Sequence, residues 1–141
     1  MYKRLPYCIL FILCLVSATA LADTYTVTSV ADTLTPGTLR WAMTSANTNP
    51  GADTIDFGML LPAEIVPASP LPTITNSNTE IMGGVYPPQV TLVGTGTTDG
   101  LQFQNVTNCT VKNLIIRNFS GNAINLNSTD YSFFLGNWLL S

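Results

Sequence analysis

Residues 101–139 read LQFQNVTNCTVKNLIIRNFSGNAINLNSTDYSFFLGNWL and contain one short pattern twice, 23 positions apart. Sequence repeats of 20–50 residues are typical of stacked coils, in which each coil buries its apolar side on the next. The stretch therefore predicts a solenoid of short strands. The shift places apolar residues on apolar residues: Leu101 on Ile124, Phe103 on Leu126, Val111 on Phe134 and Ile116 on Leu139.

The same shift predicts where each coil turns. Val111 and Leu114 both favour the core although strict strand alternation would place one of them outside. A tight corner at Asn113 resolves this conflict, because Asn tolerates the left-handed conformation. Gly136, one repeat later, tolerates it better still. Asn137 then takes the place of Leu114, and its amide needs a hydrogen-bond partner near the interior.

The first residues have the anatomy of a secretory signal. Lys3 and Arg4 precede an apolar run, Cys8–Val16, that is too short to cross a bilayer. Small residues at Ala20–Ala22 suit a signal peptidase. We expect residues 1–22 to be a cleaved signal peptide; an uncleaved anchor or a buried strand is the alternative.

The mature chain, residues 23–141, has the size of a single domain. Removal of the signal takes two of the three cysteines with it, so Cys109 has no internal disulfide partner. We expect Cys109 to be a small buried residue rather than a reactive thiol. Ser132, at the equivalent place in the repeat, is also small, which favours packing.

The charge of the mature chain excludes some partners. Three basic residues, Arg40, Lys112 and Arg117, remain against eight acids, which leaves a net charge of −5. Binding to nucleic acid needs clustered Lys and Arg. The sequence therefore predicts no nucleic-acid binding, no docking on an acidic membrane and no membrane span in the mature chain.

One amphipathic helix is expected before the strands. Leu39, Ala42, Met43 and Ala46 form an apolar stripe at helical spacing. We expect Pro36 at the first helical position with Thr35 as the cap. Such a helix can cover the open end of the first coil, as capping elements do in solenoids. We therefore divide the mature chain into an N-terminal cap, 23–57, and coils, 58–141.

The expected strands are Thr24–Val30, Thr54–Phe57, short segments near Glu64–Val66 and Pro72–Thr75, Thr79–Met82 and Val90–Val93.

Two segments carry a resemblance to a known group. Pro36–Met43 (PGTLRWAM) with Ala46–Asn47, followed by Gly51–Phe57 (GADTIDF), resembles the start of secreted bacterial right-handed parallel β-helix proteins. These include pectate-lyase-like proteins and CSLREA-domain, polymorphic outer-membrane or autotransporter-like surface proteins. The chain has Gly37 where the CSLREA motif has its cysteine and Trp41 where it has an acid. The resemblance implies an all-β, right-handed parallel β-helix with a short N-terminal capping helix, in a longer chain with a C-terminal anchor or barrel.

No catalytic, cofactor-binding or metal-binding residue is predicted. Glycoside hydrolysis uses two carboxylates on one site, but no two acids lie one 23-residue repeat apart. Asp53 and Asp56 flank an expected strand, and we interpret both as structural. Lys112 and Arg117 are interpreted as solvated surface charges. The sequence has no histidine, and the glycines of Gly94–Gly100 lack the lysine of a phosphate-binding loop.

Asn105, Asn108, Asn118 and Asn127 each begin an Asn-X-Ser/Thr triplet. Because the resemblance is bacterial, we interpret these residues as coil corners and exposed polar positions rather than glycosylation sites.

The sequence favours a non-catalytic secreted or cell-surface β-helix protein, a scaffold or adhesin-like module. Its expected partners are surface glycans or further coils of a longer chain. Trp138–Ser141 follows directly on an apolar strand, so we expect the chain to be the N-terminal part of a larger surface protein, incomplete at its C-terminus. The alternative is a polysaccharide lyase or glycoside hydrolase whose site lies outside this chain.

Overall fold

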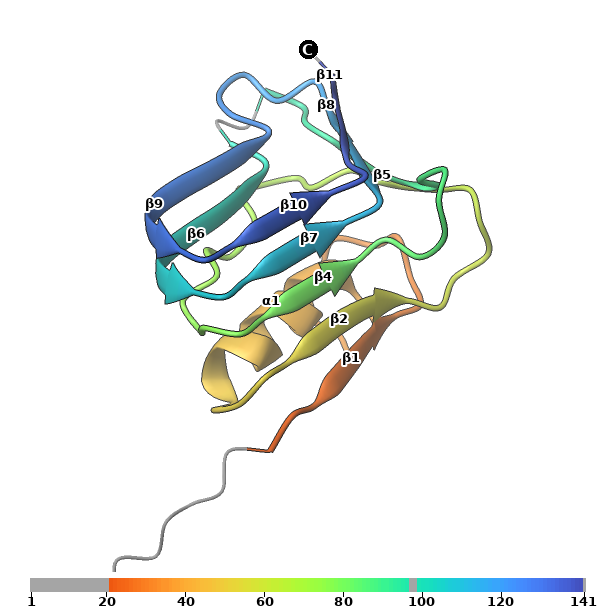
Figure 1. The fold of residues 1–141 in the computed structure, drawn as a ribbon. Helices are drawn as coiled ribbons and strands as arrows, with labels where there is room; N and C mark the ends of the chain where they lie inside the picture. The colour runs from red at the N-terminus through yellow and green to blue at the C-terminus, as the bar shows by residue number, and fades with distance from the viewer. Residues whose placement is uncertain (1–20, 97–98, 141) are drawn as a thin grey trace, which may run out of the picture.

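The structure is a computed structural model that describes residues 21–96 and 99–140. Residues 1–20, which hold nearly all of the predicted signal peptide, lie outside the described residues, so that prediction stays untested. The chain from Asp23 onward folds as stacked coils of parallel strands (Figure 1).

The strands form three parallel sheets, here named A, B and C, and the later coils pass through all three in turn. The chain moves from sheet A to sheet B to sheet C and then returns to sheet A one level higher, which confirms the predicted all-β parallel β-helix. Sheet A contains, in order, β1 (Thr24–Val27), β2 (Thr54–Phe57), β4 (Glu80–Met82), β7 (Thr110–Lys112) and β10 (Phe133–Leu135). Sheet B contains β3 (Ala63–Ile65), β5 (Val90–Val93), β8 (Leu114–Arg117) and β11 (Trp138–Leu140), and sheet C contains β6 (Leu101–Thr107) and β9 (Ile124–Asp130).

The 23-residue repeat is the register of the last two coils. Leu101 pairs with Ile124, Val111 with Phe134 and Ile116 with Leu139. The earlier coils have longer connections, so Ile81 pairs with Val111 across a larger separation. Because the loops of the earlier coils differ in length, the 23-residue repeat is visible in the sequence only for the last two coils.

A column of left-handed residues makes the corner between sheets A and B. Asn113 and Gly136 have φ values of 55° and 63°, as predicted, and Gly84 in the coil below has 90°. The Asn113 side-chain Nδ2 donates to the Gly84 carbonyl at 2.7 Å. A Cβ on Gly136 would lie 2.5 Å from Asn113 Oδ1, so a larger residue there would require the Asn113 side chain to shift.

Asparagines also form the corners on either side of sheet C. Asn78 and Asn108 have φ values of 62° and 56°, and Asn108 Nδ2 donates to Asn78 Oδ1 at 2.9 Å. Asn105 and Asn118 are also exposed with positive φ. The interpretation of the Asn-X-Ser/Thr asparagines as coil corners and exposed polar positions is confirmed: Asn108 and Asn118 lie between strands, whereas Asn105 and Asn127 are exposed within β6 and β9.

The inward residues of all three sheets form one core. Ile55, Ile81 and Val111 stack through sheet A and are fully buried. Phe103 from sheet C meets Phe134 edge to face, with ring centroids 6.0 Å apart. Each buried aliphatic side chain of this size contributes about 1.5–3 kcal/mol, so the stack is held mainly by apolar burial.

Two polar positions near the core have the partners that they need. Cys109 is fully buried, and burial raises the pKa of its thiol, which fits the predicted packing role. Its backbone N–H donates to Ser132 Oγ at 3.2 Å. Asn137 Oδ1 accepts from the Leu114 N–H at 3.0 Å, and Asn137 Nδ2 donates to the Val111 carbonyl at 2.9 Å. Both the oxygen and the nitrogen of the Asn137 side-chain amide are therefore paired with the coil below.

The helix α1 (Leu39–Thr48) packs against β1 and β2 at the start of the stack (Figure 1). Its buried residues are Leu39, Ala42, Met43 and Ala46, so the predicted stripe is confirmed. The predicted start is wrong. Thr38 is the cap, because its Oγ1 accepts from the Trp41 N–H, while Pro36 lies in the preceding turn.

Four expected strands have different bounds, and β4 begins at Glu80 instead of Thr79. β1 ends at Val27 instead of Val30, because the Thr28 and Ser29 N–H groups turn to the Gly37 carbonyl. The strand expected near Glu64–Val66 is β3, Ala63–Ile65. Pro72–Thr75 forms only a single bridge, between Ile74 and Phe103. Pro72, Thr73 and Thr75 lie outside any strand. Pro72 has no backbone N–H with which to pair.

Arg40 on α1 ties the helix to two loops. Its Nε and Nη2 donate to the Asp32 carboxylate at 2.8 and 2.9 Å, and its remaining N–H groups reach the Pro70 and Ser69 carbonyls. Asp32 also accepts from the Ala68 N–H. Burial acts to raise the pKa of Asp32, but the hydrogen bonds from Arg40 and Ala68 outweigh it, so the pKa is lowered. The N-terminal cap is thus held by a bidentate, charge-assisted ion pair between Arg40 and Asp32, here called the Asp32–Arg40 fork.

We expect Asn113→Ala to lower the free energy of unfolding by about 2–3 kcal/mol, because alanine resists the left-handed corner and the bond to Gly84 is lost. Asn113→Gly is the matched control; it keeps the corner and loses only the bond, so we expect about 1 kcal/mol. Urea unfolding followed by circular dichroism measures both. Equal losses in the two variants would contradict a left-handed corner at this position.

We expect the Asp32–Arg40 fork to make stability depend on acid. A carboxyl with a lowered folded pKa stabilises the fold above its unfolded pKa, and this contribution is lost as the pH falls through the folded value. Asp32→Asn should therefore destabilise the protein by about 1–3 kcal/mol at neutral pH. The difference from the parent chain should shrink in urea titrations at about pH 2.5. A pH-independent difference would show that the Asp32 charge does not matter.

Candidate functional site

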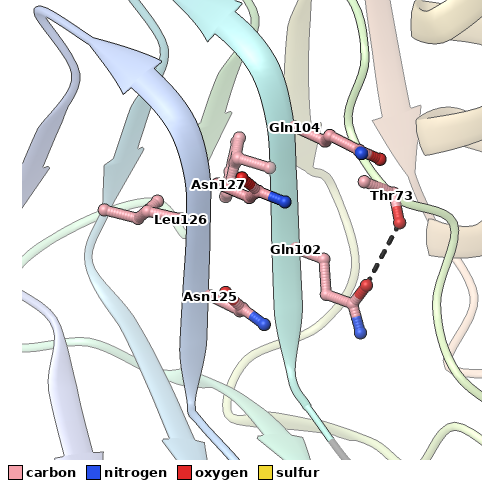
Figure 2. Close-up of a pocket in the computed structure, with 7 residues that line it drawn as sticks. Thr73, Gln102, Gln104, Asn125, Leu126 and Asn127 are labelled. Atoms are coloured by element: carbon pink, nitrogen blue, oxygen red, sulfur yellow. Dashed lines mark hydrogen bonds between the residues drawn. The ribbon is translucent and has the colours of Figure 1, made fainter.

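The outward face of sheet C presents four amide side chains. Gln102 pairs with Asn125 and Gln104 with Asn127 in the parallel register of β6 and β9. Because alternate residues of a strand point to the same face and neighbouring strands lie about 4.8 Å apart, the four amides form a rectangular array. Figure 2 shows them on one side of the two strands, with Thr73 beside them and Leu126 turned away.

These side chains line a groove of about 240 Å³. Phe103 and Leu126 also line it, but they are the inward residues of the two strands. The lining is therefore polar and uncharged. Its residues are Thr73, Gln102, Phe103, Gln104, Asn125, Leu126 and Asn127.

One half of the array is held in place by hydrogen bonds. Thr73 Oγ1 donates to Gln102 Oε1 at 3.2 Å, and Gln102 Nε2 lies 3.4 Å from Asp99 Oδ2. Asn125 Nδ2 donates to the same Asp99 oxygen at 2.8 Å, and the Asn122 N–H donates to the other at 2.7 Å. Hydrogen bonds from Asn125 and Asn122 lower the pKa of Asp99, which stays ionised at neutral pH. Asp99 thus fixes the two amides closest to it.

The other half of the array is open to a ligand. Gln104 and Asn127 are exposed, and no side-chain hydrogen bond of Gln104 occurs within the described residues. Asn127 Oδ1 accepts only from Ser128 Oγ, at 3.4 Å. A carboxamide carries two donors and one acceptor oxygen with two lone pairs. Two such groups side by side can bind the hydroxyl groups of a sugar or the peptide groups of an extended chain.

The groove has no residues for proton-transfer chemistry. Its lining contains no carboxylate, lysine, arginine or cysteine, and the neighbouring Asp99 is one carboxylate where glycoside hydrolysis uses two. The arrangement can bind and orient a polar, uncharged molecule, but its lining has no group that acts as general acid or base.

The acids weighed in the sequence analysis lie elsewhere. Asp53 is buried beside β2, where it accepts from Asn49 Nδ2, the Asp23 N–H and Asn76 Nδ2. Its place among turn residues fits the structural interpretation. Asp56 lies on β2 in sheet A, and its Oδ1 is buried without a hydrogen-bond partner.

Lys112 and Arg117 lie on the surface, as the sequence analysis expected, and each also forms an ion pair. Lys112 Nζ lies 2.6 Å from Glu80 Oε1, and Arg117 Nη2 lies 2.7 Å from Glu64 Oε1. Both pairs join different coils along the outside of the stack, in sheets A and B rather than at the groove. The sequence analysis missed them because the coils below β7 and β8 do not follow the 23-residue spacing. Exposed pairs of this kind contribute about 0–1 kcal/mol each.

Sequence reasoning also missed the groove, although the signal was present. The segments LQFQ and INLN, one repeat apart, alternate apolar residues with amides. Once the apolar residues face the core, the amides must share the outer face.

Two further findings concern residues 21–96 and 99–140. No cluster of three or more His, Cys, Asp or Glu side chains there could hold a metal ion. No helix in the same ranges is long and apolar enough to cross a membrane.

Comparison with known proteins gives no relative: no family model, no curated protein and no solved structure matches the chain.

Proposed function

We propose that this protein is a non-catalytic β-helix scaffold of the cell exterior that binds a neutral glycan in the sheet C groove. The observation that carries the proposal is the array of Gln102, Gln104, Asn125 and Asn127 on one flat face. Carboxamides both donate to and accept from hydroxyl groups, which are the chief polar groups of neutral sugars.

The charge around the groove supports a neutral rather than an acidic glycan. The nearest ionised group is Asp99, whose pKa is lowered by its amide and N–H partners. The bases Lys112 and Arg117 are engaged with Glu80 and Glu64 on the other sheets. A polyuronate would meet a like charge and no cation at this face.

The rigidity of the face supports a scaffold role. β6 and β9 are the longest strands of the described residues, with seven residues each. The inward side chains of β6 belong to the core, and Ile124 of β9 packs against it. A preorganised polar face loses less conformational entropy on binding than a mobile loop. The signal-like N-terminus and the resemblance stated above support a location outside the cell. Membership of a larger surface protein stays a prediction.

We expect neutral hexasaccharides of β-linked glucose or mannose to shift the side-chain amide NMR signals of Gln104 and Asn127. The double change Gln104→Ala with Asn127→Ala removes several hydrogen bonds of about 0.5–1.5 kcal/mol each, so binding should weaken about tenfold or more. Titration of labelled protein with each sugar measures this.

Gln89→Ala is the matched control. Gln89 precedes β5 on another side of the stack, so its loss should leave sugar binding unchanged. Hexagalacturonate should bind more weakly than the neutral sugars. Neutral sugars that cause no shift would overturn the proposal, and so would release of reducing ends or a rise in ultraviolet absorbance from a polysaccharide panel, which would support the enzymatic alternative.

A further inference from the structure

The residue that precedes β1 lies beside a buried carboxylate. Thr24 pairs with Thr54 in the ladder between β1 and β2. Asp23 and Asp53 come one residue earlier in each strand, so they lie side by side. The Thr54 N–H donates to the Asp23 carbonyl at 2.8 Å, and the Asp23 N–H donates to Asp53 Oδ1 at 3.1 Å. The ladder therefore fixes the backbone nitrogen of Asp23 against the Asp53 carboxylate.

The partners of this carboxylate are neutral. Asp53 is 1% exposed, and besides the Asp23 N–H it accepts from the side-chain amides of Asn49 and Asn76, at 2.9 and 3.3 Å. In the part of the chain that the structure describes, the ion pairs of Lys and Arg side chains all involve other acids. A carboxylate buried among neutral donors is less stable than one that faces a cation, because burial removes the water that would solvate its charge.

The bond that a signal peptidase is expected to cut joins Ala22 to Asp23, next to this carboxylate. Leu21, Ala22 and Asp23 are exposed. Asn49 Nδ2 donates to the Leu21 carbonyl at 3.2 Å, a contact that is lost when the bond is cut. The bonds of Asn49 Nδ2 to the Asp23 and Asp53 carboxylates remain. Cleavage therefore leaves the surroundings of the Asp23 nitrogen in place.

We propose that Asp53 binds the new N-terminus of the processed chain, so that removal of the signal peptide stabilises the first coil. The proposal rests on the predicted cleavage before Asp23. A peptidase adds one water across the Ala22–Asp23 amide: the C–N bond breaks, the water oxygen stays on Ala22 as part of a carboxylate, and both water hydrogens go to the Asp23 nitrogen. A neutral N–H donor at 3.1 Å from Asp53 Oδ1 is thereby replaced by an ammonium at the same place.

The charges around this nitrogen favour a cation. The ionisable groups beside it are Asp53, the side chain of Asp23 itself and Tyr25. Burial raises the pKa of Tyr25, and the negative charges of Asp53 and Asp23 raise it further. The same charges attract an ammonium. β1 is also an edge strand of sheet A, so an ion pair at its first residue holds an end of the chain that would otherwise fray.

The test begins with export of the full 141-residue chain from a secreting bacterium. The intact mass of the exported protein should be that of residues 23–141. Its amines are then the α-amine and Lys112, so Lys112→Arg, which keeps a cation beside Glu80, leaves the α-amine as the single site for acetylation.

Acetylation removes the positive charge of the N-terminus. Below the pKa of a free α-amine, it should shift the unfolding equilibrium constant about three- to tenfold towards the unfolded state, an effect between those of an exposed ion pair and a charge-assisted hydrogen bond. Urea unfolding followed by circular dichroism measures this shift.

Asp53→Asn removes the proposed partner, so acetylation should then have no effect on stability. Asp130→Asn is the matched control; it makes the same change of charge in the last coil and should leave the acetylation effect intact. NMR titration of the α-amine gives a measure that does not need a variant. Its pKa should be higher in the folded protein than in the urea-unfolded chain, because the carboxylate stabilises the protonated form.

Four results would overturn the proposal. They are an exported chain that is uncut or begins at another residue, an acetylated protein as stable as the free one, an equal loss on acetylation in Asp53→Asn, and an α-amine whose pKa is not raised by folding.

Discussion

The structure depends on one backbone constraint, the left-handed corner between sheets A and B. At Asn113 and Gly136 the chain turns within a residue or two, so the strand on each side can direct an apolar side chain into the same core. Gly84 is the left-handed residue near the start of the longer loop between β4 and β5. The corner residues also contact each other: the Asn113 amide bonds to the Gly84 carbonyl below and lies against Gly136 above. Each corner thus sets the height and direction of the next coil, and the buried columns follow from it.

The parts of the fold that repeat could be predicted from the sequence. Val111 and Leu114 cannot both be buried in one straight strand, so their spacing identified the corner at Asn113, and the 23-residue shift gave the register of the last two coils. The lower coils differ in loop length, so the ion pairs of Lys112 and Arg117 with Glu80 and Glu64 had no sequence pattern to predict them. The helix start was misplaced because proline at a first turn is only a preference, while Thr38 makes the capping bond.

The groove shows why a site can be present in a sequence and still be missed. No residue of it is a classical catalytic or metal-binding type, so a search for acids, histidines and cysteines passes over it. Gln102, Gln104, Asn125 and Asn127 become a site only when β6 and β9 lie in register, since the array is made by pairing rather than by any one segment. Asp99, two residues before β6, then fixes part of the array from its edge.

The two ends of the described stack treat the core columns differently. At the first end α1 buries its apolar stripe against β1 and β2, and the Asp32–Arg40 fork holds the helix to its loops. At the other end Leu126 and Leu139 continue the columns of Phe103 and Ile116 and are 46% and 54% exposed. Because the stability of a solenoid depends on the burial of each coil by its neighbour, the helix gives the first coil the second neighbour that β9, β10 and β11 lack among the described residues.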